Sequence, residues 1–280
     1  EVIAQVAPLH PPLPAEQPTV FVVMPFLAVG GAETVHLHVL RYLQPKARFV
    51  LITFEPHASA LGTTVEEFRA ITPYIYTLPD YLLYHLNFSL MRYLIERYQP
   101  AVLYIANGAT WIYNALGDIR KLYPNLLVGN QVYDHQAGWI NRYDSELVKQ
   151  IDAHISINDL IDKAYLAAGV RPEQVFHIEN GVDTSYFDPA GYSTADQEAI
   201  KARLGLPAGC KVVTMMGRLH PQKRPVDFIE VARRCGDDPN VVFLMVGDGP
   251  LSDTVNHQLL QTPLPNFYRR SFYKPSRDIF

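Results

Sequence analysis

Short, continuous apolar runs alternate along the chain with longer segments of helical periodicity. The first run, TVFVVM at residues 19–24, places β-branched and aromatic residues one after another without a polar break. Such runs are typical of strands covered on both faces of a parallel sheet. The helical segments space apolar residues three and four apart, as in residues 82–98, whose stripe runs from Leu82 to Tyr98. The alternation predicts an α/β protein with parallel strands joined by right-handed helical crossovers.

This alternation forms two series separated by a turn-rich segment. Strands of the first series are expected at residues 19–24, 49–54, 74–78, 101–106, 126–132, 153–157 and 175–178. Strands of the second series are expected at residues 212–216, 241–246 and 266–272. We therefore predict a proline-rich leader at 1–18, an N-terminal Rossmann-like lobe at 19–180, a linker at 181–207 and a partial C-terminal lobe at 208–280.

Composition describes a globular, mildly acidic protein. Hydrophobic residues make up 48% and charged residues 19% of the 280 residues, which is the balance of a folded chain. The net charge of −4 argues against a nucleic-acid partner, because such proteins carry a basic excess. Two cysteines, Cys210 and Cys235, are too few for a disulfide framework and favour a cytoplasmic location. No signal-peptide pattern follows Glu1, and no apolar run reaches the roughly 18 residues of a membrane span.

A basic loop in the second series has the composition of an anion-binding site. The predicted strand 212–216 ends at a glycine, and Arg218 and Lys223 follow before a helix that starts near residue 225. A helix N-terminus offers free backbone N–H groups and a partial positive charge, so two added cations favour a diphosphate ligand. The alternative is an ordinary solvated loop, since charged loop residues usually lie at the surface.

Two further candidates follow strands of the first series. Gly30 and Gly31 lie between the first strand and the first helix, where a missing Cβ lets a ligand approach the backbone. His135 lies in the loop after the strand at 126–132. Ligands of parallel sheets bind beyond the carboxyl ends of the strands, so we expect these residues to face one crevice. The alternatives are a tight turn for the glycines and a packing or surface role for the histidine.

Four motifs, read together, resemble those of glycosyltransferase family 4 in the retaining GT-B superfamily. They are GGAE at 30–33, ENGVD at 179–183, GRLHPQKRP at 217–225 and VGDGPL at 246–251. The resemblance spans residues 19–280 and implies the GT-B type of α/β fold, with two facing Rossmann-like, doubly wound parallel-sheet lobes, of which the second is incomplete here. It implies an enzyme that transfers a sugar from a nucleoside-diphosphate donor with retention of configuration.

The resemblance also implies roles for single residues. Arg218 and Lys223 would hold the donor diphosphate, Gly30 and Gly31 would approach it from the other lobe, and His135 would contact the donor sugar. The sequence contains no D-x-D motif, so a bridging metal is not expected and the two cations would replace it. No cofactor is expected beyond the donor, a UDP-, GDP- or ADP-sugar. The acceptor would be a glycan, a lipid-linked molecule or a small molecule.

The sequence departs from this family in two places. Arg224 stands where the family more often has glycine. The family's E-x7-E motif, which positions the donor sugar and ribose, would lie beyond Phe280. Together with a first residue, Glu1, that is not methionine, this suggests a piece of a longer polypeptide.

Three other functions remain open from the sequence. A non-catalytic module within a larger protein would lack the E-x7-E motif altogether. A GT-B sugar-nucleotide epimerase would use the same donor without an acceptor. A dinucleotide-binding unit at GDGP is disfavoured, because Ser252 replaces the third glycine of its fingerprint. The tyrosine- and leucine-rich segment 74–98 fits core packing, with a peripheral membrane contact as the alternative, although it lacks a basic face.

Overall fold

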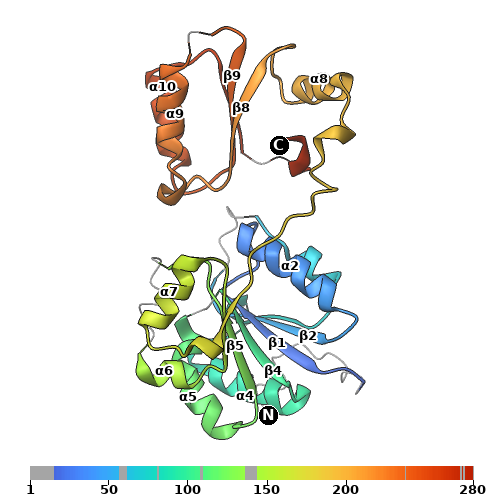
Figure 1. Cartoon of the computed structure of the whole chain (residues 1–280), viewed down its shortest axis with the longest axis vertical. Coiled ribbons are helices and arrows are strands. Elements are labelled where there is room, and N and C mark those ends of the chain that lie inside the picture. Colours follow the sequence, from blue (N-terminus) through green and yellow to red (C-terminus); the bar gives the residue numbers. More distant parts are fainter. Residues whose placement is uncertain are drawn as a thin grey trace. The chain divides into compact units, whose positions relative to one another are not determined.

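The computed structural model describes residues 16–56, 62–80, 82–107, 110–135, 144–236, 238–271, 273 and 275–279. The chain divides into two compact units, Glu1–Asn180 and Gly181–Phe280. Each unit is built around its own parallel sheet (Figure 1). Most of the predicted leader lies outside the described residues.

The first unit contains a seven-stranded parallel sheet with the order β3-β2-β1-β4-β5-β6-β7. Its strands are β1 (Thr19–Met24), β2 (Arg48–Thr53), β3 (Ile75–Thr77), β4 (Val102–Ala106), β5 (Leu127–Gln131), β6 (Ala153–Ser156) and β7 (Val175–His177). Its α-helices are α2 (Gly31–Leu43), α3 (Val65–Arg69), α4 (Asn87–Tyr98), α5 (Thr110–Leu122), α6 (Ser145–Lys149) and α7 (Asp159–Ala167). The strand order changes direction between β1 and β4, which is where such sheets bind ligands at their carboxyl edge.

Both faces of β1, at the centre of this sheet, are buried, as its continuous apolar run predicts. Phe21 and Val23 of β1 join a core cluster with residues of α4, α5 and α7, whereas Val22 and Met24 join a second cluster with α2 and α3. Successive strand residues point to opposite faces, so a strand between two helical layers needs apolar residues at every position. The predicted doubly wound α/β fold is confirmed for this unit.

The helix expected at residues 82–98 is shorter in the structure. Residues Tyr84–Leu86 form a 3₁₀ turn, and α4 begins only at Asn87. Leu90 and Leu94 are fully buried, whereas Leu83 and Tyr84 are 67% and 63% exposed. The helical spacing continues toward Leu82, which packs against the same core cluster as Leu90 and Leu94, but Leu83 and Tyr84 between them stay exposed outside the helix.

The second unit contains a three-stranded parallel sheet with the order β10-β9-β8. Its strands are β8 (Lys211–Met216), β9 (Val241–Val246) and β10 (Phe267–Arg270), and its helices are α8 (Thr194–Arg203), α9 (Pro225–Arg234) and α10 (Ser252–Gln261). The order repeats that of β3-β2-β1 in the first unit. The sequence predicts β8 as a buried strand, but Val213 is 40% exposed, because within the described chain β8 pairs only with β9.

The segment 181–207 differs from a simple linker. It contains α8, whose Ile200 and Leu204 pack with Val242 and Leu244 of β9 in a core cluster of the second unit. A capping box formed by Ser193 and Asp196 starts this helix. The helical part of the predicted linker therefore belongs to the second unit, because its apolar side chains cover one face of that unit's sheet. Among the described residues, no helix is long and apolar enough to cross a lipid bilayer.

Candidate functional site

The loops that follow β8 and β9 contact each other through their backbones. Gly217 N–H donates to Val246 O over 2.9 Å, and Leu219 N–H donates to Asp248 O over 2.9 Å. The Leu251 N–H in turn donates to Leu219 O over 2.9 Å. These hydrogen bonds hold the basic loop and the GDGP turn together at the carboxyl end of the second sheet.

Glycines make this close approach sterically feasible. A Cβ added to Gly247 would lie 1.9 Å from Gly217 O, and one added to Gly249 would lie 2.7 Å from Leu219 O. Both glycines also have positive φ angles, 146° and 155°, which other residues rarely adopt. The two loops can therefore pack this closely only because the GDGP motif has glycines at positions 247 and 249.

Arg218 and Lys223 are exposed at this end of the sheet and carry no partner charge. Within the described parts of the chain, neither side chain makes an ion pair or a hydrogen bond. Lys223 closes a 3₁₀ turn at Pro221–Lys223, and α9 begins two residues later with Pro225 at its first position. The structure therefore places two unneutralised cations on the loop that leads into the N-terminus of α9, as the sequence predicts.

Arg224 has a left-handed backbone and forms an ion pair, neither of which the sequence analysis predicted. Its backbone is left-handed, with φ 53° and ψ 50°, which costs a residue with a Cβ roughly 1–2 kcal/mol. This conformation explains why glycine suits the position. The Arg224 guanidinium forms an ion pair with Asp227 in the first turn of α9. Its charge is thus already neutralised, unlike those of Arg218 and Lys223.

A third cation near this loop, Arg269 on β10, escaped the sequence analysis. Its Nε and Nη2 atoms are buried and form no hydrogen bond with the residues that the structure describes. Asp248 Oδ1 lies 3.9 Å from Nη2. The hydroxyl of Ser252 and the Gly249 N–H donate to the Asp248 carboxylate, so the pKa of Asp248 lies below its usual value. The one feature of the sequence that could have indicated this cation is the pair of adjacent arginines, Arg269 and Arg270, at the end of the predicted strand.

In the first unit, Gly30 and Gly31 differ in their surroundings. A Cβ on Gly30 would lie 2.3 Å from the carboxylate of Glu33, whereas one on Gly31 would meet no atom within 4 Å. Gly30 caps α2 in an extended conformation, with φ −160°, that any residue can adopt. The bare backbone at Gly30 thus accommodates the buried side chain of Glu33, and only Gly31 leaves open space beside the chain.

His36, one turn into α2, is a buried polar residue at the same edge. It is 0% exposed, its Nε2 lies 3.4 Å from the hydroxyl of Tyr133, and its ring packs edge-on against Tyr104 and Tyr133. Its Nδ1 has no hydrogen-bond partner among the described residues. These contacts join the start of α2 to the loop after β5. His38, two residues further along α2, is exposed and lies on a different face of the helix.

His135 lies in that same loop after β5. Its side chain is 34% exposed, and its Nδ1 lies 3.9 Å from Asp134 Oδ1. Gly108 and residues 136–139, which follow β4 and β5 in the sequence, lie outside the described residues. The structure therefore places Gly30, Gly31 and His135 at the carboxyl edge of the first sheet, and Arg218 and Lys223 at that of the second. That both sets meet one diphosphate stays a prediction.

Burial of two histidines predicts acid sensitivity of the first unit. Burial lowers the pKa of both His36 and His154 from 6.5 to about 4. Between these values the unfolded chain binds more protons, so stability falls with falling pH, by up to about 3 kcal/mol per histidine. Tryptophan fluorescence reports this unit, because Trp111 and Trp139 both belong to it.

The variant His36→Leu should show a smaller loss of unfolding free energy between pH 6.5 and pH 4.5 than the wild type. The matched control His38→Leu, on the exposed face of α2, should keep the wild-type slope. Equal slopes for all three proteins would show that His36 is not titrating as its burial requires.

Comparison with known proteins finds a family match within the second unit. Residues 196–279, which begin in the first turn of α8 and include α9 and α10, match the family model described as glycosyl transferases group 1. The chain is 40% identical over 91 residues to UDP-Gal:alpha-D-GlcNAc-diphosphoundecaprenol alpha-1,3-galactosyltransferase of Escherichia coli. That alignment covers 31% of this chain and 23% of the relative.

Solved structures resemble the fold over nearly the whole chain. Anabaena HepE in complex with UDP-glucose matches with a TM-score of 0.71 at 17% identity, covering 93% of this chain and 70% of HepE. UDP-GlcNAc 2-epimerase from Neisseria meningitidis, bound to UDP-GlcNAc, matches with a TM-score of 0.57 at 14% identity, covering 93% and 74%. At these identities the likeness shows the fold alone, and the match to glycosyl transferases group 1 covers residues 196–279.

Proposed function

We propose that this chain is part of a retaining glycosyltransferase of family 4, which transfers a sugar from a nucleoside-diphosphate donor to an acceptor. The observation that carries the proposal is the pair of exposed, unpaired cations, Arg218 and Lys223, ahead of α9. This pair lies inside the segment that matches glycosyl transferases group 1.

The site suits the chemistry of glycosyl transfer. The bond between the anomeric carbon and the β-phosphate oxygen breaks, and negative charge develops on the leaving diphosphate. Arg218 offers a planar fork that can hold two phosphate oxygens, and Lys223 offers a compact charge. The N-terminus of α9 adds the partial positive charge of the helix dipole. These groups stabilise the leaving group electrostatically, so a bridging metal ion is not needed in this mechanism.

We infer that the donor is a UDP-sugar. The Escherichia coli relative is named for UDP-Gal, and HepE was solved with UDP-glucose. The name of the same relative also indicates a diphosphoundecaprenol-linked acceptor, which suggests a lipid-linked saccharide acceptor here. Such an acceptor would require the enzyme to work at the cytoplasmic membrane surface. His135 and Gly31, at the carboxyl edge of the first sheet, are the residues we propose for contact with the donor sugar and for approach of the substrate.

An epimerase is the second candidate, favoured by the likeness to UDP-GlcNAc 2-epimerase. It would convert a UDP-sugar without any acceptor. A non-catalytic module would bind no donor. The transferase, the epimerase and the non-catalytic module therefore predict different products from the same mixture of UDP-sugar and acceptor.

The test is a thermal-shift series with UDP, GDP and ADP, followed by product analysis. A nucleotide present at 100 times its Kd should stabilise the protein by about 2.7 kcal/mol, so UDP should raise the Tm while GDP and ADP raise it less. Incubation with UDP-galactose or UDP-glucose and a lipid-diphosphate saccharide should then give UDP and an extended acceptor. Absence of any nucleotide effect contradicts donor binding, and an epimerised sugar without acceptor supports the second candidate.

A further inference from the structure

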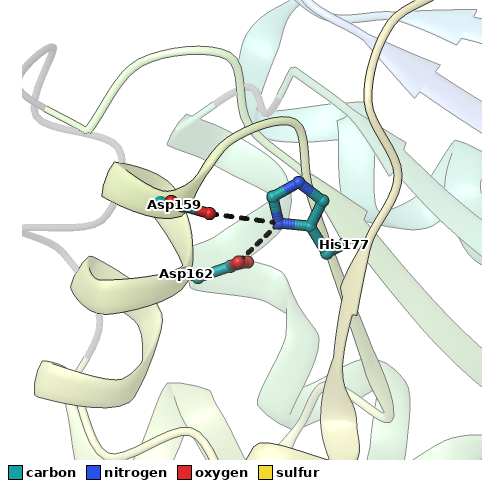
Figure 2. A group of neighbouring side chains, drawn as sticks. All are labelled: Asp159, Asp162 and His177. Atoms are coloured by element: carbon teal, nitrogen blue, oxygen red, sulfur yellow. Dashed lines mark hydrogen bonds and ion pairs between the residues drawn. The ribbon is translucent and has the colours of Figure 1, made fainter.

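A cluster of metal-ligating side chains in the first unit contains none of the residues to which a role was assigned above. Asp159 and Asp162 stand three residues apart in the first turn of α7, so both face the same side of the helix. His177 ends β7, the strand next to β6, which leads into α7. Figure 2 shows the two carboxylates pointing toward the imidazole.

The donor atoms lie close enough to share one ion. Nδ1 of His177 is 2.6 Å from Asp162 Oδ2 and 4.0 Å from Asp159 Oδ1. One ligand atom from each of the three residues lies within 4.8 Å of the other two. Asp159 is 82% exposed, so the side of the cluster next to this residue is open to water.

Two residues outside the cluster orient its ligands. The hydroxyl of Ser156, at the end of β6, donates to Asp162 Oδ1 and leaves Oδ2 directed at the histidine. Glu179 Oε1 lies 3.7 Å from Nε2 of His177, on the far side of the ring from the two aspartates. A carboxylate beside the second ring nitrogen, and a hydrogen bond to a ligating carboxylate, are the outer-sphere contacts that accompany metal sites in proteins.

We propose that Asp159, Asp162 and His177 form a binding site for a divalent cation of borderline softness, with Zn²⁺ as the best fit. One imidazole and two carboxylates supply a charge of −2, which balances the ion, and water can complete the coordination on the open side. The site joins the end of β7 to the start of α7. Its role is therefore structural, and the proposal is independent of the proposed glycosyl transfer.

A bound proton competes with the cation. The hydrogen bond to Asp162 raises the pKa of His177, and Glu179 and Asp159 act in the same direction. These carboxylates are the charged groups that we find facing the ring from α7 and from the segment after β7.

Isothermal titration with ZnCl₂ at pH 7.5 in a non-chelating buffer tests the site. The wild type should bind one ion, and His177→Gln and Asp162→Asn should each weaken binding by more than about 100-fold. Asp159→Asn should also weaken binding with little effect on folding, because an ion pair at 4.0 Å from a side chain that is 82% exposed contributes little to stability. Glu179→Gln should cost about tenfold, as expected for an outer-sphere partner.

Two controls separate this site from adventitious binding. His257→Gln removes an exposed histidine elsewhere and should leave the titration unchanged. Co²⁺ should give a d–d absorption spectrum with the wild type that disappears in His177→Gln. No saturable Zn²⁺ binding, or equal binding by the wild type, His177→Gln and Asp159→Asn, would reduce the cluster to an ordinary ion pair and overturn the proposal.

Discussion

Replacing Arg218 and Lys223 together with alanine is expected to weaken UDP binding by at least about a hundredfold. Each charged hydrogen bond to a phosphate contributes roughly 1.5–3 kcal/mol, and a factor of ten corresponds to about 1.4 kcal/mol. Neither side chain has a partner in the described parts of the protein, so their loss leaves no buried group behind. Isothermal titration with UDP measures the effect, and release of UDP from a UDP-sugar should fall in parallel.

Arg224→Ala is the matched control for this experiment. Arg224 belongs to the same loop and is also exposed, but Asp227 already pairs with it. UDP affinity should change by less than about threefold, since a surface ion pair contributes about 0–1 kcal/mol. If the double variant binds UDP as the wild type does, with an unchanged circular dichroism spectrum, the basic loop is a solvated surface loop.

Gly247→Ala is expected to destabilise the second unit by more than about 3 kcal/mol. The added methyl group would lie 1.9 Å from the carbonyl oxygen of Gly217, where no flexible side chain can yield. The residue also has φ 146°, so backbone strain adds to the overlap. Either β8 or β9 must move, which would separate the basic loop from the GDGP turn. Hydrogen exchange of the amides of β8 and β9 measures the loss.

Gly209→Ala is the control that separates steric overlap of the added methyl group from backbone strain. Gly209 has φ 71°, but a Cβ there would meet no atom within 4 Å. Its replacement should therefore cost only about 1–2 kcal/mol. Tryptophan fluorescence, which reports the first unit, should change little in either variant, because each unit has its own core clusters. Equal hydrogen exchange in Gly247→Ala and the wild type would show that the two loops are not in contact in solution.

Much of the fold was predictable because parallel sheets impose a local pattern. β1 and β9 have the bounds that their apolar runs predicted, since a strand buried on both faces must be apolar throughout. Less regular features were not predictable. The start of α4 at Asn87 and the exposure of β8 depend on which surfaces are covered by other elements.

For the candidate site, the sequence motifs predicted which residues lie on which loop, but they did not predict the contacts between side chains. The sequence placed Arg218 and Lys223 between a strand and a helix, and the structure agrees. It did not show that Arg224 is neutralised by Asp227, that Arg269 is partly buried next to Asp248, or that Glu33 fills the space beside Gly30. Each of these facts is a distance between side chains, and spacing along the chain does not determine such distances.

Sequence patterns therefore sufficed to predict the α/β class, the order of strands and helices along the chain, and the loops that carry the charged and glycine motifs. These follow from hydrophobic periodicity and turn chemistry, which are local properties of the chain. The tertiary structure shows which polar groups are paired, and it brings His177 close to Asp159 and Asp162. This pairing joins elements that are separate in sequence, because electrostatic and hydrogen-bond interactions act over a few ångströms in space.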